Sequence, residues 1–166
     1  MTFYIKQLAT QDYASVKDIF CLTFLKEDIP VSYLGYRWRN RTRENSFGIY
    51  NRAGDLLGFA LVSDGRHHQQ QQLEKDKKHT DVASRYLSFM ALHPDYRGGA
   101  LGSELLKVVL MATVNDNKSL CLFPLEDTRL KAWYKHNGFN LSTHEYFNFH
   151  CHGTRSQAKY LAALKV

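Results

Sequence analysis

The stretch that decides the fold is Met90-Ala91-Leu92-His93-Pro94-Asp95-Tyr96-Arg97-Gly98-Gly99-Ala100-Leu101-Gly102-Ser103-Glu104-Leu105-Leu106. It starts as a β-prone run that Pro94 closes, and it ends as a helix whose apolar residues keep helical spacing to about Val114. A junction of this kind gathers unpaired backbone N–H groups at the positive end of a helix, and glycines let a ligand approach the backbone. The stretch predicts an anion site with Arg97 at its rim, and a plain tight turn at Gly98-Gly99 is the alternative.

Further elements follow on both sides of this stretch. The sequence predicts a first strand, two helices, a hairpin, a short buried strand, a further helix and two last strand segments. These elements lie, in chain order, at residues 3–8, 10–24, 31–36, 46–50 with 56–63, 120–124, 128–137, and 139 onward with 145–151. Thr10 is the expected N-cap of the first helix, and Thr154 with Gln157 forms a capping box that predicts a terminal helix over about 154–165.

The segment from Asp64 to Val82 differs from its surroundings. It contains His67-His68, four consecutive glutamines and a mixture of Lys, Asp and Glu, with almost no apolar residue to anchor it. We expect a mobile loop inserted at about 64–82. Because the sequence shows neither an internal repeat nor a linker, residues 1–166 are expected to form a single α+β domain.

The composition fits a globular protein. The chain has 166 residues, 44% hydrophobic and 23% charged, so a core needs no disulfides or metal. No run approaches the ~18 apolar residues of a membrane span, and the N-terminus lacks a signal-peptide layout. Three widely spaced cysteines argue against a disulfide framework. We expect a cytoplasmic protein that makes no membrane contact. The net charge of +6 favours acidic partners but does not choose between nucleic acid and a phosphorylated cofactor.

Two motifs together resemble a known family. Arg97-Gly98-Gly99-Ala100-Leu101-Gly102 is similar to the Arg/Gln-x-x-Gly-x-Gly/Ala signature of the GNAT superfamily of acetyl-CoA-dependent N-acetyltransferases, with Ala100 where Gly is usual. Downstream, Ala132-Trp133-Tyr134-Lys135-His136-Asn137-Gly138-Phe139 resembles that family's Phe-Tyr-x-x-x-Gly-Phe helix end. The resemblance covers roughly residues 1–149. It implies a GNAT-like, mostly antiparallel central sheet that is flanked by helices and splayed at its central strands.

The resemblance also implies how acetyl-CoA binds as co-substrate. The backbone amides of the loop would hold the diphosphate, and the strand before it would pair with the pantetheine arm. Asp127 stands where the family often has Asn. The cofactor-binding residues implied in this way are Met90, Ala91, Leu92, Arg97, Gly98, Gly99, Ala100, Leu101, Gly102, Ser103, Asp127 and Tyr134.

Catalysis by this family needs an acid, and an amine acceptor needs to lose a proton. Tyr134 is the candidate general acid, because a phenol stays protonated at neutral pH and can protonate a leaving thiolate; packing beside Leu130 and Trp133 is its alternative role. For the base, Ser88 and Tyr86 share one strand face and would act through ordered water. Glu27, Asp28 and Glu145 are the expected substrate-binding residues and the alternative bases.

Two other patterns, one of arginines and one of histidines, are each compatible with a binding function or with a plain structural role. Arg37, Arg39, Arg41 and Arg43 would form a basic stripe if the segment were extended, and would scatter over a solvated face at a helix end. His150 with His152 could hold a metal, but the sequence offers no convincing third and fourth ligand. The His67-His68 pair with His79 could also bind a metal, and a solvated loop is the favoured interpretation there, so no metal site is predicted.

These observations predict an N-acetyltransferase that acts on a primary amine, with a small molecule such as a polyamine as the favoured acceptor. Acetylation of a protein lysine or N-terminus is the first alternative. A basic nucleic-acid-binding module, or a domain that binds CoA without catalysis, are the others, and nucleic acid is the less favoured partner. Dimers are common in the family, so a homodimer is expected without an identifiable interface.

Overall fold

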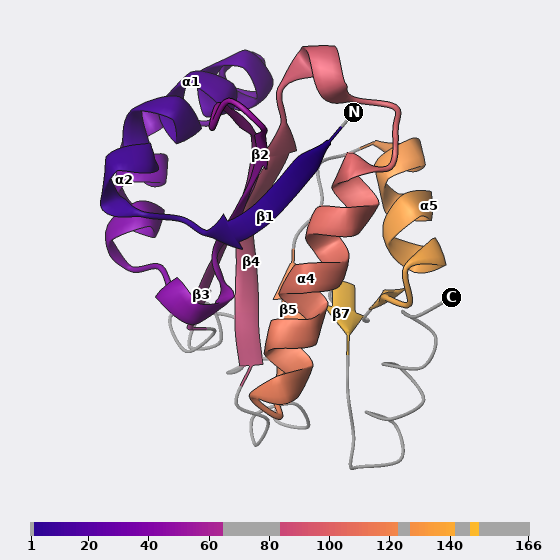
Figure 1. The fold of residues 1–166 in the computed structure, drawn as a ribbon. Coiled ribbons are helices and arrows are strands. Elements are labelled where there is room, and N and C mark those ends of the chain that lie inside the picture. Colours follow the sequence, from indigo (N-terminus) through magenta and orange to yellow (C-terminus); the bar gives the residue numbers. More distant parts are fainter. Residues whose placement is uncertain (1, 65–83, 123–126, 142–146, 150–166) are drawn as a thin grey trace. The chain divides into compact units, whose positions relative to one another are not determined.

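The computed structural model describes residues 2–64, 84–122, 127–141 and 147–149 (Figure 1). The helices and strands, in chain order, are β1 (Phe3–Gln7), α1 (Tyr13–Phe24), α2 (Val31–Arg39), β2 (Phe47–Asn51), β3 (Leu56–Asp64), β4 (Ser84–Leu92), α4 (Leu101–Asn115), β5 (Ser119–Leu122), α5 (Thr128–His136), β6 (Asn140–Leu141) and β7 (Phe147–Phe149). Short 3-10 helices connect several of them, namely η1 (Thr10–Asp12), η2 (Leu25–Glu27), η3 (Arg43–Asn45) and η5 (Pro94–Tyr96). Within these ranges the order of elements is the predicted one. The predicted helix over 154–165, and the predicted loop apart from Asp64, lie outside the described residues.

The first of two compact units comprises Met1–Ser63 and Ser88–Ala112. Its strands follow the order β1-β2-β3-β4, with β1 antiparallel to β2 and β2 antiparallel to β3. The hairpin prediction is confirmed, since the amide of Asn51 donates to the carbonyl of Asp55 across the turn (3.0 Å). Helix α1 packs its apolar stripe on this sheet, where the rings of Phe20 and Phe24 lie 5.0 and 5.2 Å from the ring of Phe89 on β4. Burial of such aromatic side chains is what holds the helix on the sheet.

The start of helix α1 corrects one prediction. Thr10 is not the N-cap of a long helix, because Thr10–Asp12 form η1 and α1 begins at Tyr13. The carboxylate of Asp12 accepts hydrogen bonds from the Ala9 amide (2.7 Å) and the Tyr50 hydroxyl (2.8 Å). A charged acceptor with two donors holds this corner more firmly than a threonine hydroxyl would.

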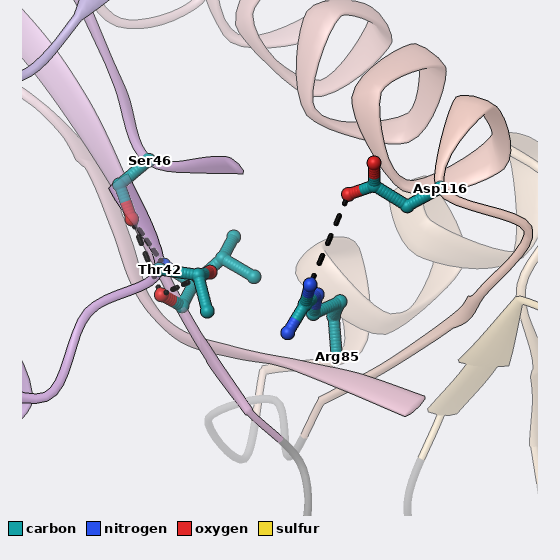
Figure 2. Close-up of polar contacts among 5 residues, drawn as sticks. Thr42, Ser46, Arg85 and Asp116 are labelled. Carbon is teal, nitrogen blue, oxygen red and sulfur yellow. Dashed lines mark hydrogen bonds and ion pairs between the residues drawn. The ribbon is translucent and has the colours of Figure 1, made fainter. Parts of the chain in front are cut away.

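Hydrogen bonds fasten the segment before β2 to the end of β3 (Figure 2). The Val62 carbonyl accepts from the amide and the hydroxyl of Thr42 (2.8 and 3.0 Å) and from the Ser46 hydroxyl (3.2 Å). The Val62 amide donates to the same Ser46 oxygen (3.0 Å). The Thr42 amide and the two hydroxyl groups thus satisfy both backbone polar groups of Val62, a fully buried residue.

The arginines that precede β2 do not form a stripe. Helix α2 continues to Arg39, so Arg37 and Arg39 lie on a helix, whereas Arg41 pairs with Ser63 as an isolated bridge and Arg43 belongs to η3. The extended interpretation is therefore wrong. The solvated interpretation is confirmed for Arg39 and Arg43, which are exposed, and is wrong for Arg37, whose exposed fraction is 8%.

The second unit comprises Asp64–Leu87 and Thr113–Val166, and its strands follow the order β4-β5-β7-β6. The start of β4 is parallel to β5, with the described register ending at Tyr86 opposite Cys121, while β5 with β7 and β6 with β7 are antiparallel. The Arg85 guanidinium lies 3.9 Å from the Asp116 carboxylate (Figure 2). The sheet is thus mixed and mostly antiparallel, as predicted, and the described pairing of β4 with β5 stops before Met90 and Leu92.

Candidate active site

Strand β4 ends in a tight corner that leads to the anion-site candidate. The His93 amide donates to the Leu57 carbonyl of β3 (2.7 Å), and the His93 ring nitrogen Nδ1 accepts from the Asp95 amide (3.2 Å). Pro94 opens η5, as a residue without an N–H can at the first position of a helical turn. These polar groups of the corner are thus hydrogen-bonded within the protein, unlike the backbone amides of the residues that follow.

Six consecutive backbone amides, from Gly98 to Ser103, have no hydrogen-bond partner among the residues that the structure describes. The next amide, that of Glu104, donates to the Ala100 carbonyl (3.0 Å) and is the first bond of α4. The first N–H groups of a helix carry its positive end, so these amides form a donor set suited to an anion.

The backbone of this loop is also open to a ligand. Gly98 has φ +82°, a left-handed conformation that residues with a side chain rarely adopt. A Cβ atom placed on Gly98 or Gly99 would meet nothing within 4 Å. Packing therefore does not require glycine there, whereas the backbone angle of Gly98 does. The loop fits a phosphate group that needs close access to amides.

Arg97 is held across the base of the loop. Its Nε donates to the Leu92 carbonyl (3.0 Å), and its Nη2 donates to the hydroxyl of Thr23 on α1 (2.7 Å). The side chain is therefore fixed at two points, although it is exposed. The predicted rim charge is present, and one lone pair of the Leu92 carbonyl is already used.

The strand before the loop lies close to β3 because of a glycine. A Cβ atom on Gly58 would lie 2.8 Å from the Ala91 carbonyl oxygen and 2.5 Å from a methyl carbon of Leu92, so no side chain fits there. Ala91 is buried, with 7% of its surface exposed. Ser88, on the same strand, shares a hydrogen bond with the buried Ser63 of β3, their hydroxyl oxygens being 3.2 Å apart.

The remaining candidate residues that are described belong to the second unit. Tyr134, on α5, is 6% exposed, and its ring makes edge contacts with Trp133 and Phe139 at centroid distances of 5.0 and 5.4 Å. Burial raises the pKa of the Tyr134 phenol above its ordinary value. Such a group keeps its proton at neutral and moderately alkaline pH, as a general acid must. Tyr86 is similarly buried, at 8% exposed.

Asp127 caps helix α5. Its carboxylate oxygen Oδ1 accepts from the amides of Arg129 (2.9 Å) and Leu130 (3.2 Å). The motif that ends this helix has the expected form, since Gly138 has φ +92° and the Phe139 amide donates to the Tyr134 carbonyl (3.1 Å). Oδ1 of Asp127 therefore caps the helix that carries Tyr134.

The loop and helices α4 and α5 lie in a part of the chain that matches a known protein family. A family model for the acetyltransferase (GNAT) domain matches residues 43–141, more than half of the 166. The chain belongs to the GNAT acetyltransferase family. It is therefore an N-acetyltransferase of a family whose members take the acetyl group from acetyl-CoA.

Several solved structures have a similar fold. The GNAT family acetyltransferase of Brucella melitensis in complex with acetyl-CoA is 14% identical, with a TM-score of 0.65 over 92% of this chain and 90% of that chain. Arabidopsis thaliana Naa50 with the bisubstrate analogue CoA-Ac-MVNAL is 16% identical, with a TM-score of 0.65 over 89% and 97%. The ribosomal-protein-S18-alanine N-acetyltransferase of Escherichia coli is 16% identical, with a TM-score of 0.60 over 89% of both chains. The comparison with curated proteins gives no match.

The residues predicted to bind the acceptor are less well defined in this GNAT chain. Glu27 ends η2, and Asp28 follows in a left-handed conformation with φ +57°; both are exposed. Glu145 lies outside the described residues, as do His150 and His152 and the histidines at 67, 68 and 79. Among described residues, no three His, Cys, Asp or Glu side chains are grouped to hold a metal ion. No helix in the described part of the chain is long and apolar enough to cross a membrane.

Sequence reasoning missed three residues that support the site. Gly58 had a usable signal, because an isolated glycine inside an apolar strand often marks a close backbone approach. Thr23 and Ser63 had none, since each contacts a partner that is distant in sequence. The Thr23–Arg97 bond, for example, joins residues 74 positions apart.

Proposed function

We propose that this GNAT chain transfers the acetyl group of acetyl-CoA to the primary amine of a small molecule, such as a polyamine, by direct attack on the thioester. The six amides of Gly98–Ser103 without a described partner carry the proposal, because a diphosphate is the anion that such a donor set fits. Residues 1–166 are proposed to act as one N-acetyltransferase domain. In support, the family model spans parts of both compact units.

In this proposal, the loop amides and the Arg97 guanidinium bind the diphosphate, and the β4 backbone at Met90–Leu92 orients the pantetheine arm. Asp127 is proposed to contribute to the cofactor site at the start of the helix that it caps. Acetyl-CoA supplies an activated acyl group and a thiol leaving group. The chain's own task is to position that group, to take up the amine's proton and to deliver a proton to the departing sulfur.

Tyr134 is proposed to donate the latter proton from its hydroxyl. Its raised pKa keeps the phenol neutral, and a thiolate that forms in equally buried surroundings becomes a stronger proton acceptor than one in water. Proton removal from the amine is proposed to pass through ordered water held by Ser88 and Tyr86. The exposed carboxylates of Glu27 and Asp28, together with Glu145, are proposed to attract a cationic acceptor by charge.

A second acceptor class has support from structural neighbours. Two of the similar structures carry names that indicate peptide or protein N-terminal substrates, namely the complex with CoA-Ac-MVNAL and the S18-alanine enzyme. Acetylation of a protein N-terminus or lysine is therefore the alternative. The family match favours both of these acyl transfers over a nucleic-acid-binding module.

Release of free thiol from acetyl-CoA tests the proposal. Four acceptors should be compared. Two are small amines, namely spermidine and a simple diamine. The other two are a peptide with a free N-terminus and the same peptide with a blocked N-terminus and one lysine. Turnover with the small amines is expected. Turnover with the peptides alone would transfer the assignment to the alternative. If the chain binds acetyl-CoA but releases no thiol in the presence of any of these acceptors, the proposed acceptor classes are contradicted. If it does not bind acetyl-CoA, the proposal itself is contradicted.

A further inference from the structure

Thr23 presents a fixed acceptor to the cofactor loop. Its hydroxyl donates to the Ile19 carbonyl one turn back on α1 (2.9 Å), which is a common use of a threonine within a helix. That bond directs the hydroxyl hydrogen into the helix and leaves the oxygen lone pairs for another donor. Nη2 of Arg97 fills this role at 2.7 Å.

Arg97 therefore has a defined set of remaining donors. A guanidinium has five N–H groups, and two of them are used, at Leu92 and Thr23. The others have no partner among the described residues, and no described carboxylate lies within ion-pair distance of Arg97. Two neutral oxygens thus orient the side chain, and its charge has no counter-ion within the described parts of the chain.

We propose that Thr23 is a positioning residue that acts through Arg97, holding the guanidinium so that its free N–H groups face the phosphate bound by the Gly98–Ser103 amides. This inference rests on the proposed function, because it requires the loop to bind acetyl-CoA. Thr23 lies on α1, whereas Arg97 and the loop precede α4, and all of them belong to the first compact unit. Pre-orientation matters because a guanidinium that must be ordered on binding loses side-chain entropy at that step.

Two variants of Thr23 separate the hydroxyl from the shape of the side chain. Thr23→Val keeps the branched shape and removes the acceptor, whereas Thr23→Ser keeps the acceptor and removes a methyl group. Calorimetric titration should give an acetyl-CoA Kd about tenfold weaker for Thr23→Val, the lower end of the range expected for one hydrogen bond to a charged group. For Thr23→Ser the Kd should stay within about twofold of the wild type, because the acceptor is kept. We expect the KM for acetyl-CoA to rise in parallel while kcat changes little.

A double-mutant cycle with Arg97→Gln distinguishes positioning from a purely structural role. If Thr23 acts through Arg97, Thr23→Val should cause no further loss of affinity once Arg97 is replaced. Equal losses in both backgrounds would overturn the inference. Thr23→Ala serves as a second variant, should Thr23→Val unfold. Wild-type binding that neither replacement weakens overturns this inference alone, whereas a wild type that does not bind acetyl-CoA overturns the proposed function with it.

Discussion

Helices α4 and α5 begin with the same backbone bond and different side chains. In α4 the Ala100 carbonyl accepts from the Glu104 amide, and in α5 the Asp127 carbonyl accepts from the Lys131 amide, both at 3.0 Å. Ala100 and Asp127 therefore occupy equivalent N-cap positions. The Asp127 carboxylate then accepts from two further amides of α5, whereas the methyl group of Ala100 accepts none, and the first amides of α4 have no partner in the described part of the chain.

The difference separates stability from binding. A capping carboxylate satisfies the start of its helix and contributes about 1 kcal/mol to folding. The start of α4 has no capping carboxylate and lacks this stabilisation, which a bound ligand anion can provide. The candidate catalytic group of α5 lies near the C-terminal end of that helix, whose last turn carries the buried phenol of Tyr134. Under the proposed function, one helix contributes backbone donors and the other contributes a side-chain acid.

The largest effect is expected when the N-cap residue of α5 is copied onto α4. Ala100→Asp should place a carboxylate among the free amides, where it competes with the diphosphate. Two unit charges about 4 Å apart at an effective dielectric constant of about 20 repel by about 4 kcal/mol, so the acetyl-CoA affinity should fall by about a thousandfold. Isothermal calorimetry measures this loss, and the thermal midpoint should stay equal or rise.

Ala100→Asn is the matched control for that change, because asparagine caps a helix without charge. It should weaken binding much less than Ala100→Asp while it stabilises α4 to a similar degree. Unchanged affinity in the aspartate variant would mean that the anion does not bind at the start of α4.

The next largest effect is expected at the other end of α5. Tyr134→Phe should lower kcat by about a hundredfold, the lower range for loss of a general acid, with the KM for acetyl-CoA nearly unchanged. Because burial raises the pKa of Tyr134, its proton is retained as the pH rises toward 10, so Tyr134 should impose no alkaline loss of wild-type activity below that pH. Rates of thiol release over pH 7–10 provide the measurement. A variant that turns over like the wild type would leave Tyr134 with a packing role.

A smaller effect separates the two glycines of the loop. Gly98→Ala should lower the free energy of unfolding by about 1–2 kcal/mol, because φ +82° is unfavourable for a residue with a Cβ atom. Gly99→Ala is the control, since its Cβ atom also meets nothing within 4 Å and its φ is not in the left-handed range. Urea unfolding of both variants should show the difference, and equal losses would show that conformational strain at Gly98 is not the cause.

The smallest expected effect concerns the cap itself. Asp127→Ala should lower the free energy of unfolding by about 1 kcal/mol, which corresponds to a fall of about 2–4 °C in Tm for a chain of this size. Asp127→Asn should retain most of the stability, since its amide oxygen can accept from the same two amides. If alanine and asparagine behave alike, the bonds to Arg129 and Leu130 contribute little in solution.

The loop and its helix were predictable because the signal is local. Pro94 ends the strand, the glycines mark the turn and the apolar spacing after Leu101 identifies α4, all within one short stretch. The hairpin of β2 and β3 was predictable for the same reason. The arginine pattern at 37–43 left two interpretations open, because alternation in sequence forms a stripe only in an extended strand; α2 continues through Arg39, so the helix-end interpretation applies there.

What the sequence could not supply is contact between distant residues. Nothing near Thr23 indicates that its hydroxyl meets Arg97, and nothing near Ser63 indicates Ser88. The exposure of Arg37 was also misjudged, because burial of a charged side chain depends on which elements pack around it. Orientation of a site by neighbouring elements is a tertiary property, and motif spacing does not encode it.

Backbone amide chemical shifts report whether the start of α4 binds the diphosphate. In an NMR titration of the 15N-labelled chain with acetyl-CoA, we expect the largest shift changes at the amides of Gly98 to Ser103 and much smaller changes at the capped amides of Arg129 and Leu130. Saturable binding that leaves the Gly98–Ser103 amides unperturbed would contradict this expectation.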